Sequence, residues 1–292
     1  MGFVMSRVWI IGPLAWDTIL HIPQIPPAGE FVQGHGLHGR PGGTAANVAV
    51  GLASAGIETG FAGYVGDDDL GLKLLRSLEE SAIQELHIQT LPGDSNNVLL
   101  LINESGERTI IGLTEDRLDQ VSIQDVDLSA DDFVVFVLWR PHFLGDLEYA
   151  KKNGCTVIVG IEALKSIPQI SADICIGSGS DITAELDIAS CLTRFGRIVI
   201  THGVDGADQY WEEGGEIRKI HQPAIKVDKV IDTTGAGDSF LAGYIKGLID
   251  PVPANDAPLL IGAHWSAVAV TSHQSTAPDW ADVVRQLPRE YR

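Results

Sequence analysis

Residues 232–240 read DTTGAGDSF and lead into an apolar stretch that runs to Ile249. The small residues lie just before a helix predicted over 236–249. The first N–H groups of a helix have no intrahelical partner and stand at the positive end of the helix dipole, and glycines let another group approach the backbone closely. The run therefore predicts a helix start that binds an anion, such as a phosphate or the charge that develops in phosphoryl transfer.

Asp238 lies in the first turn of this predicted helix. A carboxylate at that place can accept a proton from a substrate hydroxyl. The residues alone leave a second interpretation open, in which the run is a glycine-rich helix start and Asp238 only complements the helix dipole.

The rest of the chain alternates between short apolar runs and helical patterns. This alternation is typical of a parallel sheet covered by helices. The expected strands are Val8–Ile11, Thr59–Val65, Phe133–Leu138, Thr156–Ile161, Ile174–Ile176 and Ile198–Thr201, and the expected helices are Thr44–Ala55, Leu70–Ala82, Ala236–Ile249 and Leu259–Ser272.

Two segments interrupt the alternation. Residues 13–41 hold five prolines and several glycines, which predicts extended or looped chain rather than helix. The apolar runs 98–102 and 109–113 flank Glu104-Ser105-Gly106-Glu107, which predicts a β-hairpin. A third pattern, Gly34-His35-Gly36-Leu37-His38-Gly39, fits GxGxxG but opens no helix, so it does not predict a dinucleotide site.

The run at 232–240 and the upstream Gly42-Gly43-Thr44-Ala45-Ala46-Asn47 together resemble the two signatures of the PfkB, or ribokinase-like, carbohydrate kinases. Their order and separation match, and the segments 62–71 (AGYVGDDDLG) and 201–206 (THGVDG) are similar to two further parts of that family. The resemblance covers nearly the whole chain, and the nearest subgroup is the ketohexokinase and sulfofructose kinase group. It implies a three-layer α/β/α sandwich with a mostly parallel sheet, one kinase domain over 1–292, and a small β lid from about 13–41 and 98–113.

The resemblance also implies a reaction and a site. The reaction is ATP-dependent phosphorylation of a sugar hydroxyl, with Asp238 as base and the N–H groups of Gly235, Ala236 and Gly237 as an anion hole. The residues implied on the sugar side are Asp17, Gly42, Gly43 and Asn47, and Arg140, at the end of the 133–138 strand, is a further candidate. Those implied on the nucleotide side are Thr201, Gly203, Gly206, Gly235, Gly237 and His264.

The metal positions depart from the family pattern. Family members often carry Asn-x-x-Glu to order magnesium-bound water, and the corresponding stretch here is Ser178-Gly179-Ser180-Asp181. Asp181 is a hard oxygen ligand that suits Mg²⁺. Asp232 matches a position that binds a monovalent cation in some members, and a need for K⁺ stays open. The frequent Asp-x-Asn after the middle strand is replaced by Gly160-Ile161-Glu162-Ala163, which leaves the Mg²⁺ arrangement and sugar specificity open.

Composition excludes several classes of partner. The net charge is −19 and no basic cluster occurs, so nucleic acid is not an expected partner. No apolar run reaches about 18 residues, so no membrane span is expected. Three cysteines without CxxC spacing indicate a reducing compartment, and we expect a cytoplasmic enzyme. The family resemblance further implies a homodimer that forms through the lid.

The sequence predicts an uncharged sugar, with a ketose such as fructose ahead of a pentose such as ribose. A phosphosugar would need cationic partners, yet 26–32 contains no Lys or Arg, and Arg40 and Arg140 are the only candidates nearby. Two alternatives remain. One is a nucleoside kinase, which would need an apolar or aromatic slot for the base, and the other is a kinase-fold protein that binds ligand without turnover, which the intact Asp238 disfavours.

Overall fold

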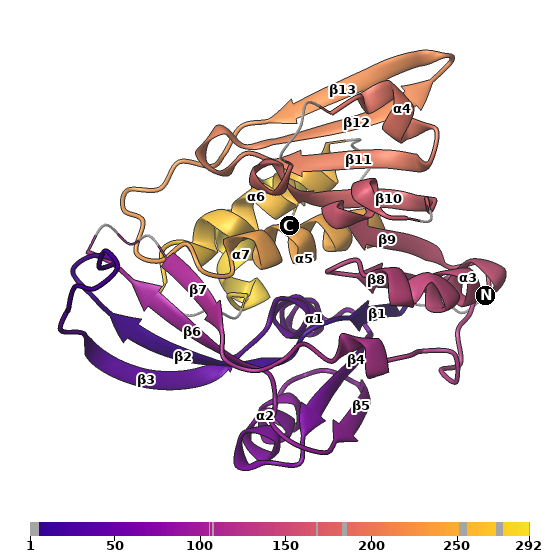
Figure 1. Ribbon diagram of the computed structural model, residues 1–292. Helices are drawn as coiled ribbons and strands as arrows, with labels where there is room; N and C mark the ends of the chain where they lie inside the picture. Colours follow the sequence, from indigo (N-terminus) through magenta and orange to yellow (C-terminus); the bar gives the residue numbers. More distant parts are fainter. Residues whose placement is uncertain are drawn as a thin grey trace.

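The computed structural model describes residues 6–104, 106, 108–167, 169–182, 186–250, 256–272 and 277–291 (Figure 1). Within that part, the larger sheet has nine strands in the order β13-β12-β11-β10-β9-β8-β1-β4-β5. Neighbouring strands are parallel from β5 to β11, and β12 and β13 extend the sheet as an antiparallel ribbon. The strands are β1 (Val8–Ile11), β4 (Thr59–Gly66), β5 (Glu85–Leu91), β8 (Phe133–Phe136), β9 (Thr156–Gly160), β10 (Ala172–Ser178), β11 (Phe195–Thr201), β12 (Ala207–Glu213) and β13 (Glu216–Gln222).

Helices cover both faces of this sheet. Alternate residues of β1 point to opposite sides, so Val8 and Ile10 pack in one core cluster and Trp9 and Ile11 in the other. The first cluster takes in α1 (Thr44–Ser54), α2 (Asp69–Glu79), α5 (Ala236–Ile249), α6 (Ala257–Ala269) and α7 (Trp280–Gln286), and the second takes in α3 (Leu144–Lys152) and α4 (Ile188–Leu192). The predicted three-layer α/β/α sandwich is confirmed.

A second, four-stranded sheet stands beside the first, in the order β3-β2-β6-β7. Its strands are β2 (Ala15–His21), β3 (His35–Gly42), β6 (Asn97–Ile102) and β7 (Arg108–Gly112). The predicted hairpin is present, because β6 and β7 pair antiparallel, although Ser105 and Glu107 of its turn lie outside the described residues. The GxGxxG pattern falls in the first part of β3, so its third glycine opens no helix.

The sequence patterns located the strongly apolar elements to within three residues at each end but missed others. The strands β5, β12 and β13 and the helices α3, α4 and α7 were not predicted as named elements. Strand β13 is largely exposed and β5 is only partly buried, so neither carries the continuous apolar run of a strand covered on both faces. Among the described residues no helix is long and apolar enough to span a membrane, and the three cysteines are buried and free.

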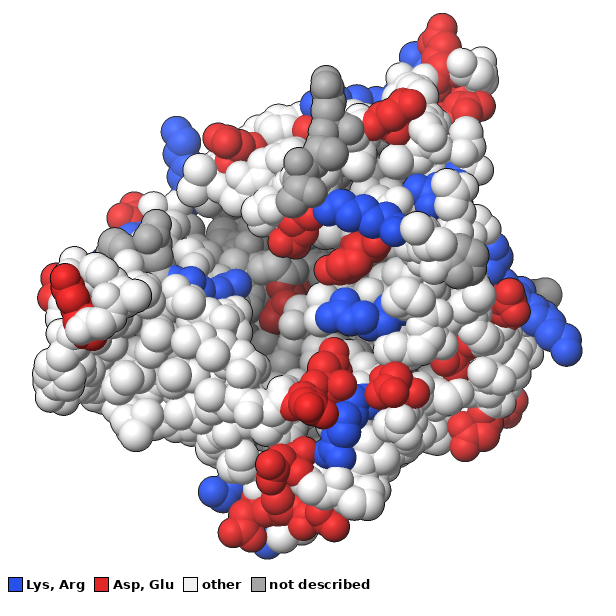
Figure 2. Space-filling model, viewed as in Figure 1, with Lys and Arg blue, Asp and Glu red and all other residues white. Residues whose placement is uncertain are grey.

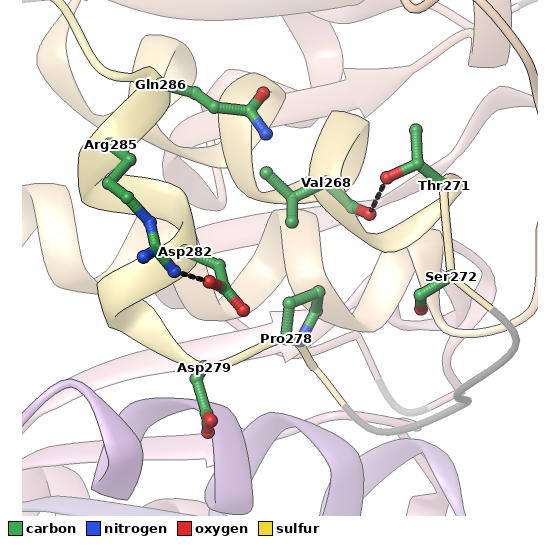
Figure 3. A pocket seen from close by; sticks show the side chains of 8 residues that line it. All are labelled: Val268, Thr271, Ser272, Pro278, Asp279, Asp282, Arg285 and Gln286. Carbon is green, nitrogen blue, oxygen red and sulfur yellow. Dashed lines mark hydrogen bonds and ion pairs between the residues drawn. The ribbon is translucent and has the colours of Figure 1, made fainter.

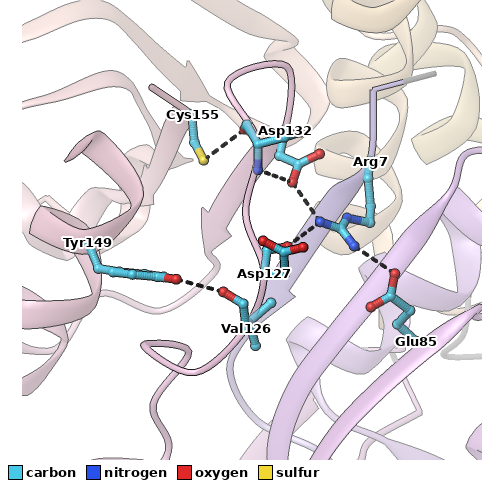
Figure 4. A network of polar contacts seen from close by, with 8 residues as sticks. Arg7, Glu85, Val126, Asp127, Asp132, Tyr149 and Cys155 are labelled. Carbon is cyan, nitrogen blue, oxygen red and sulfur yellow. Dashed lines mark hydrogen bonds and ion pairs between the residues drawn. The ribbon is translucent and has the colours of Figure 1, made fainter. Parts of the chain in front are cut away.

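A polar network around Arg7 links the amino ends of strands in the large sheet (Figure 4). The Arg7 guanidinium contacts Glu85 of β5 at 2.7 Å and Asp132, next to β8, at 2.9 Å. It also donates to the carbonyl of Asp127. Asp132 is buried, so its charge depends on this pairing. The network therefore joins strands on either side of β1.

Candidate active site

Part of the predicted site assembles where the second sheet, the carboxyl end of β1 and the amino end of α5 come together, namely Asp17, Asn47, Asp232 and Asp238. Helices α1 and α5 pack against each other. Asn47, in the first turn of α1, donates from Nδ2 to Oδ2 of Asp238 at 2.8 Å. In the space-filling view, the surface is hollowed between the second sheet and the strand ends of the large sheet that face it. Acidic side chains lie inside the hollow (Figure 2).

Asp238 has an environment that suits a base. Burial raises its pKa to about 6, and the negative charge of Asp17 adds to the rise. The hydrogen bond from Asn47 and the positive charge of Arg108 oppose it. A carboxylate with a raised pKa that is still ionised at neutral pH is a stronger base than an ordinary Asp.

Asp17 forms the second carboxylate of the site. It lies on β2, is 6% exposed, and burial raises its pKa to about 6 against the charges of Arg40 and Arg108. Gly42 on β3 leaves the space that the Asp17 carboxylate fills, because any Cβ at that position would overlap the carboxylate atoms. Gly43 has φ +102°, and a Cβ there would meet the Pro13 carbonyl oxygen and the Leu14 backbone. Both glycines therefore bring the second sheet close to the start of α1.

Two arginines of the second sheet reach the site. Arg40, paired with Asp17 in the β2–β3 register, lies 3.9 Å from the Asp17 carboxylate through Nε and 3.9 Å from the Asp232 carboxylate through Nη2. Arg108, the first residue of β7, has an exposed side chain whose charge acts on both Asp17 and Asp238. Arg108 could not be predicted from the sequence, because its position depends on how the hairpin folds over the 231–238 loop.

The amino end of α5 has the geometry of an anion site. Gly235 caps the helix at φ +75°, and Thr234 donates its N–H to Oδ1 of Asp232 at 2.8 Å. Ala236 donates weakly to the Thr233 carbonyl at 3.3 Å, whereas the N–H groups of Gly237 and Asp238 make no hydrogen bond within the described part of the chain. A Cβ at Gly237 would meet open space.

Buried polar atoms near this helix start also lack partners. The atoms are Asn47 Oδ1, Thr234 Oγ1 and Ser239 Oγ, each without a hydrogen bond to any described residue. Buried polar atoms are normally paired. Their presence beside free helix N–H groups fits a site that is completed by a polar, anionic ligand.

The residues predicted for the nucleotide side lie along the neighbouring strand ends. Thr201 ends β11, and a turn over 202–206 follows, with Gly203 at φ +58° and Gly206 at φ +96°. A Cβ at Gly206 would collide with the backbone of 222–224, so only glycine fits. His264 lies on α6 with 8% exposure, burial lowers its pKa, and its Nδ1 has no partner among the described residues.

No contact within the described ranges joins the two predicted metal residues, Asp181 and Asp232. In the described ranges no three His, Cys, Asp or Glu side chains are arranged to hold a metal ion. Asp181 is exposed, and its carbonyl accepts from Lys165 at 3.2 Å. Glu162 follows β9, in the stretch that replaces the family's Asp-x-Asn, and was not predicted as a metal ligand. Its Oε2 is buried without a hydrogen-bond partner within those ranges. Such an oxygen suits a hard cation such as Mg²⁺. Asp232 accepts the Thr234 N–H at 2.8 Å and lies 3.9 Å from Arg40, and its role toward K⁺ stays a prediction.

Arg140 stands apart from this group. Its guanidinium lies 3.9 Å from the Asp116 carboxylate and donates to the Trp139 carbonyl, and no contact joins it to Asp17 or Asp238. A further pocket between the ends of α6 and α7 contains none of the predicted site residues (Figure 3). Its lining residues are Val268, Thr271, Ser272, Pro278, Asp279, Asp282, Arg285 and Gln286.

Comparison with known proteins agrees with this geometry. The family model described as "pfkB family carbohydrate kinase" matches residues 5–136 and 178–282. The chain is 28% identical to an ATP-dependent ribose-1-phosphate kinase of Halopiger xanaduensis, over 82% of this chain and 84% of that protein. It is 26% identical to a ribokinase of Lactococcus lactis, over 97% of each chain. The crystal structure of the Methanocaldococcus jannaschii nucleoside kinase superposes with a TM-score of 0.75 at 22% identity, over 96% of this chain and 97% of that one.

Proposed function

This chain belongs to the PfkB family of carbohydrate kinases, and from that premise we propose that it transfers the terminal phosphoryl group of ATP to a hydroxyl of a small neutral sugar, with Asp238 as the base. The contact between Asn47 and Asp238 carries the proposal. It joins the two signature segments at one carboxylate, and that carboxylate stands next to the free N–H groups of α5.

The residues divide the reaction between them. Asp17 and Asn47 hold hydroxyls of the sugar, and Asp238 accepts the proton of the attacking hydroxyl as its oxygen bonds to phosphorus. The N–H groups at the start of α5 stabilise the negative charge on the transferred group, and the phosphorus–oxygen bond to ADP breaks. Thr201, Gly203, Gly206 and His264 line the nucleotide side.

Magnesium is expected with the nucleotide. Glu162 and Asp181 follow the adjacent strands β9 and β10 and would hold Mg²⁺, directly or through water, beside the phosphates. When bound, the ion neutralises phosphate charge as the leaving group departs. We derive no step through K⁺, because the Asp232 carboxylate already faces Arg40.

The second sheet serves as a lid over this site. Gly106 of its hairpin turn lies over Ile231, which precedes the 232–238 loop. A Cβ added at Gly106 would stand 4.0 Å from the Ile231 carbonyl oxygen. A lid that covers the sugar keeps water from competing for the phosphoryl group. The outer part of the lid exposes apolar side chains, and we propose that two chains pack there as a homodimer. The exposed residues are Leu37, Ile110, Ile111 and Leu113.

A neutral sugar agrees with the charges in the site. Arg40 is the cation nearest to Asp17, and two carboxylates already balance it. One observation favours a second candidate, a phosphosugar. Arg108 has no ion pair among the described residues, and the relative from Halopiger xanaduensis acts on ribose 1-phosphate.

A substrate panel separates the candidates. Fructose, ribose, their monophosphates including ribose 1-phosphate, and nucleosides are compared at equal concentration by ADP release. We expect the highest kcat/KM for a neutral sugar, with fructose ahead of ribose. A kcat/KM for a phosphosugar at least tenfold above every neutral sugar would overturn the neutral-sugar assignment, and Arg108→Gln should then reduce turnover of the phosphosugar selectively. Phosphorylation of nucleosides alone would overturn both.

A further inference from the structure

Another buried carboxylate, Asp208, lies behind the turn on the nucleotide side, outside the machinery described above. Asp208 is the second residue of β12 and is 7% exposed. Four side chains surround its carboxylate. They are His202 at 3.1 Å, His221 at 2.8 Å, Lys219 at 3.0 Å and the Tyr210 hydroxyl at 3.3 Å.

The surroundings fix the charge of Asp208. Burial opposes its ionisation, but the hydrogen bonds from Lys219, His221 and His202 outweigh burial and lower its pKa. An ionised carboxylate only accepts hydrogen bonds. The Nε2 atom of His202 must therefore carry the proton that it shares with Asp208. This contact fixes the orientation of the imidazole ring, so that Nδ1 points away from Asp208.

His202 stands between two loops of the site. Its backbone lies in the 202–206 turn, where its N–H donates to the Gly206 carbonyl at 2.7 Å. The opposite edge of its ring, at Nδ1, packs on Gly179, where a Cβ would stand only 3.1 Å away. The ring thus spans from β12 to the segment 178–181, which follows β10 and holds Asp181.

We propose that Asp208 is a positioning residue for the nucleotide, which acts through His202 to hold the 202–206 turn and the 178–181 segment in the arrangement that receives ATP. This inference rests on the proposed function, in which Thr201, Gly203 and Gly206 face the nucleotide. Tyr210, Lys219 and His221 contact the same carboxylate from the edge ribbon, and no hydrogen bond or ion pair among the described residues joins their side chains to the two loops.

The test measures nucleotide affinity apart from turnover. Titration calorimetry with Mg²⁺ and the non-hydrolysable analogue adenylyl imidodiphosphate, without sugar, gives the dissociation constant of each variant. We expect Asp208→Asn and His202→Ala each to weaken binding by about tenfold. The double variant should lose no more affinity than the more impaired single variant, because both substitutions remove the same contact. In sugar kinetics, Asp208→Asn should raise the KM for ATP and leave the KM for the sugar within about twofold.

Tyr210→Phe is the matched control, since it removes one hydrogen bond from the same oxygen and leaves His202 in place. It should bind the analogue as the wild type does. Equal loss of affinity in Tyr210→Phe and Asp208→Asn would overturn the proposal and assign the network to stability of the edge ribbon. His202 lies in a partly exposed turn, so His202→Ala tests the contact even if Asp208→Asn does not fold, and wild-type affinity in His202→Ala would also overturn the proposal. A wild-type chain that binds the analogue but phosphorylates nothing contradicts the proposed function alone.

Discussion

Asp238 and Asp17 share one small, buried region, and burial raises the pKa of each to about 6. A base must be deprotonated to accept a proton, so kcat/KM should be constant near neutral pH and fall as the pH decreases through about 6. Because each carboxylate affects the other, the acid limb of the profile reports the pair rather than Asp238 alone.

The hydrogen bond from Asn47 and the charge of Arg108 both favour the ionised form of Asp238. Asn47→Ala and Arg108→Gln should each raise the pKa of this carboxyl and move the acid limb of kcat/KM toward higher pH, even where the maximal rate also falls. Arg218→Gln, on the exposed strand β13, removes the same charge far from the site and is the control. An acid limb that stays in place in both site variants would contradict the assignment of Asp238 as the titrating base.

The residue types of the site were predictable, but several of their contacts were not. Asp238 and the glycines of the 232–240 run carry a chemical signal in the local sequence, whereas Asp17 and Asn47 could be named only because the chain resembles the PfkB family. The contact between Asn47 and Asp238 spans 191 residues and depends on how α1 packs on α5. Arg108 and Glu162 carry no local signal, because their place follows from a hairpin and a strand end that meet only in the fold.

At the scale of elements, the backbone geometry at the start of α5 requires glycine at position 235 but not at position 237. Gly235 adopts φ +75°, which costs any other residue about 1–2 kcal/mol. Gly237 has no such φ, and a side chain there would meet open space. A branched residue at 237 would therefore leave the loop geometry unstrained and could act only by crowding the phosphate.

These two glycines give a paired prediction. Gly235→Ala should lower the free energy of unfolding by about 1–2 kcal/mol in urea and also reduce turnover, because the helix N–H groups shift. Gly237→Val should unfold at the same urea concentration as the wild type, yet lose nearly all activity through contact with the transferred group. Full activity in Gly237→Val would show that the anion is bound elsewhere.

The helices and strands could be predicted where they are buried, because burial leaves an apolar pattern in the sequence. Strands covered on both faces, such as β1 and β9, are apolar throughout and were located from sequence. The ribbon of β12 and β13 at the sheet edge is rich in charged and polar residues, has no continuous apolar run and was not located. That ribbon holds Asp208, so the network around His202 could not be predicted from the sequence.

At the scale of the whole molecule, the lid raises the question of assembly. Its strands expose Leu37, Ile110 and Ile111, and a cluster of exposed apolar side chains on one sheet marks a surface that binds another protein. We predict that the chain is a homodimer in solution and that Ile110→Lys shifts the mass measured by sedimentation toward the monomer. Ile167→Lys, which changes an apolar residue exposed elsewhere, should remain a dimer. A wild-type chain that sediments as a monomer at micromolar concentration would contradict this role of the lid.

The central claim is that Asp238 removes the proton from the sugar hydroxyl, and the rate of Asp238→Asn with the best sugar tests it most directly. The substitution keeps the size of the side chain and removes the base, so kcat should fall by about 10²–10⁴-fold. The dissociation constants for sugar and nucleotide should stay within a few-fold of the wild type. The variant should be at least as stable as the wild type at pH 8, since ionising the buried Asp238 opposes folding above its pKa of about 6. A kcat within about tenfold of the wild type would contradict the account.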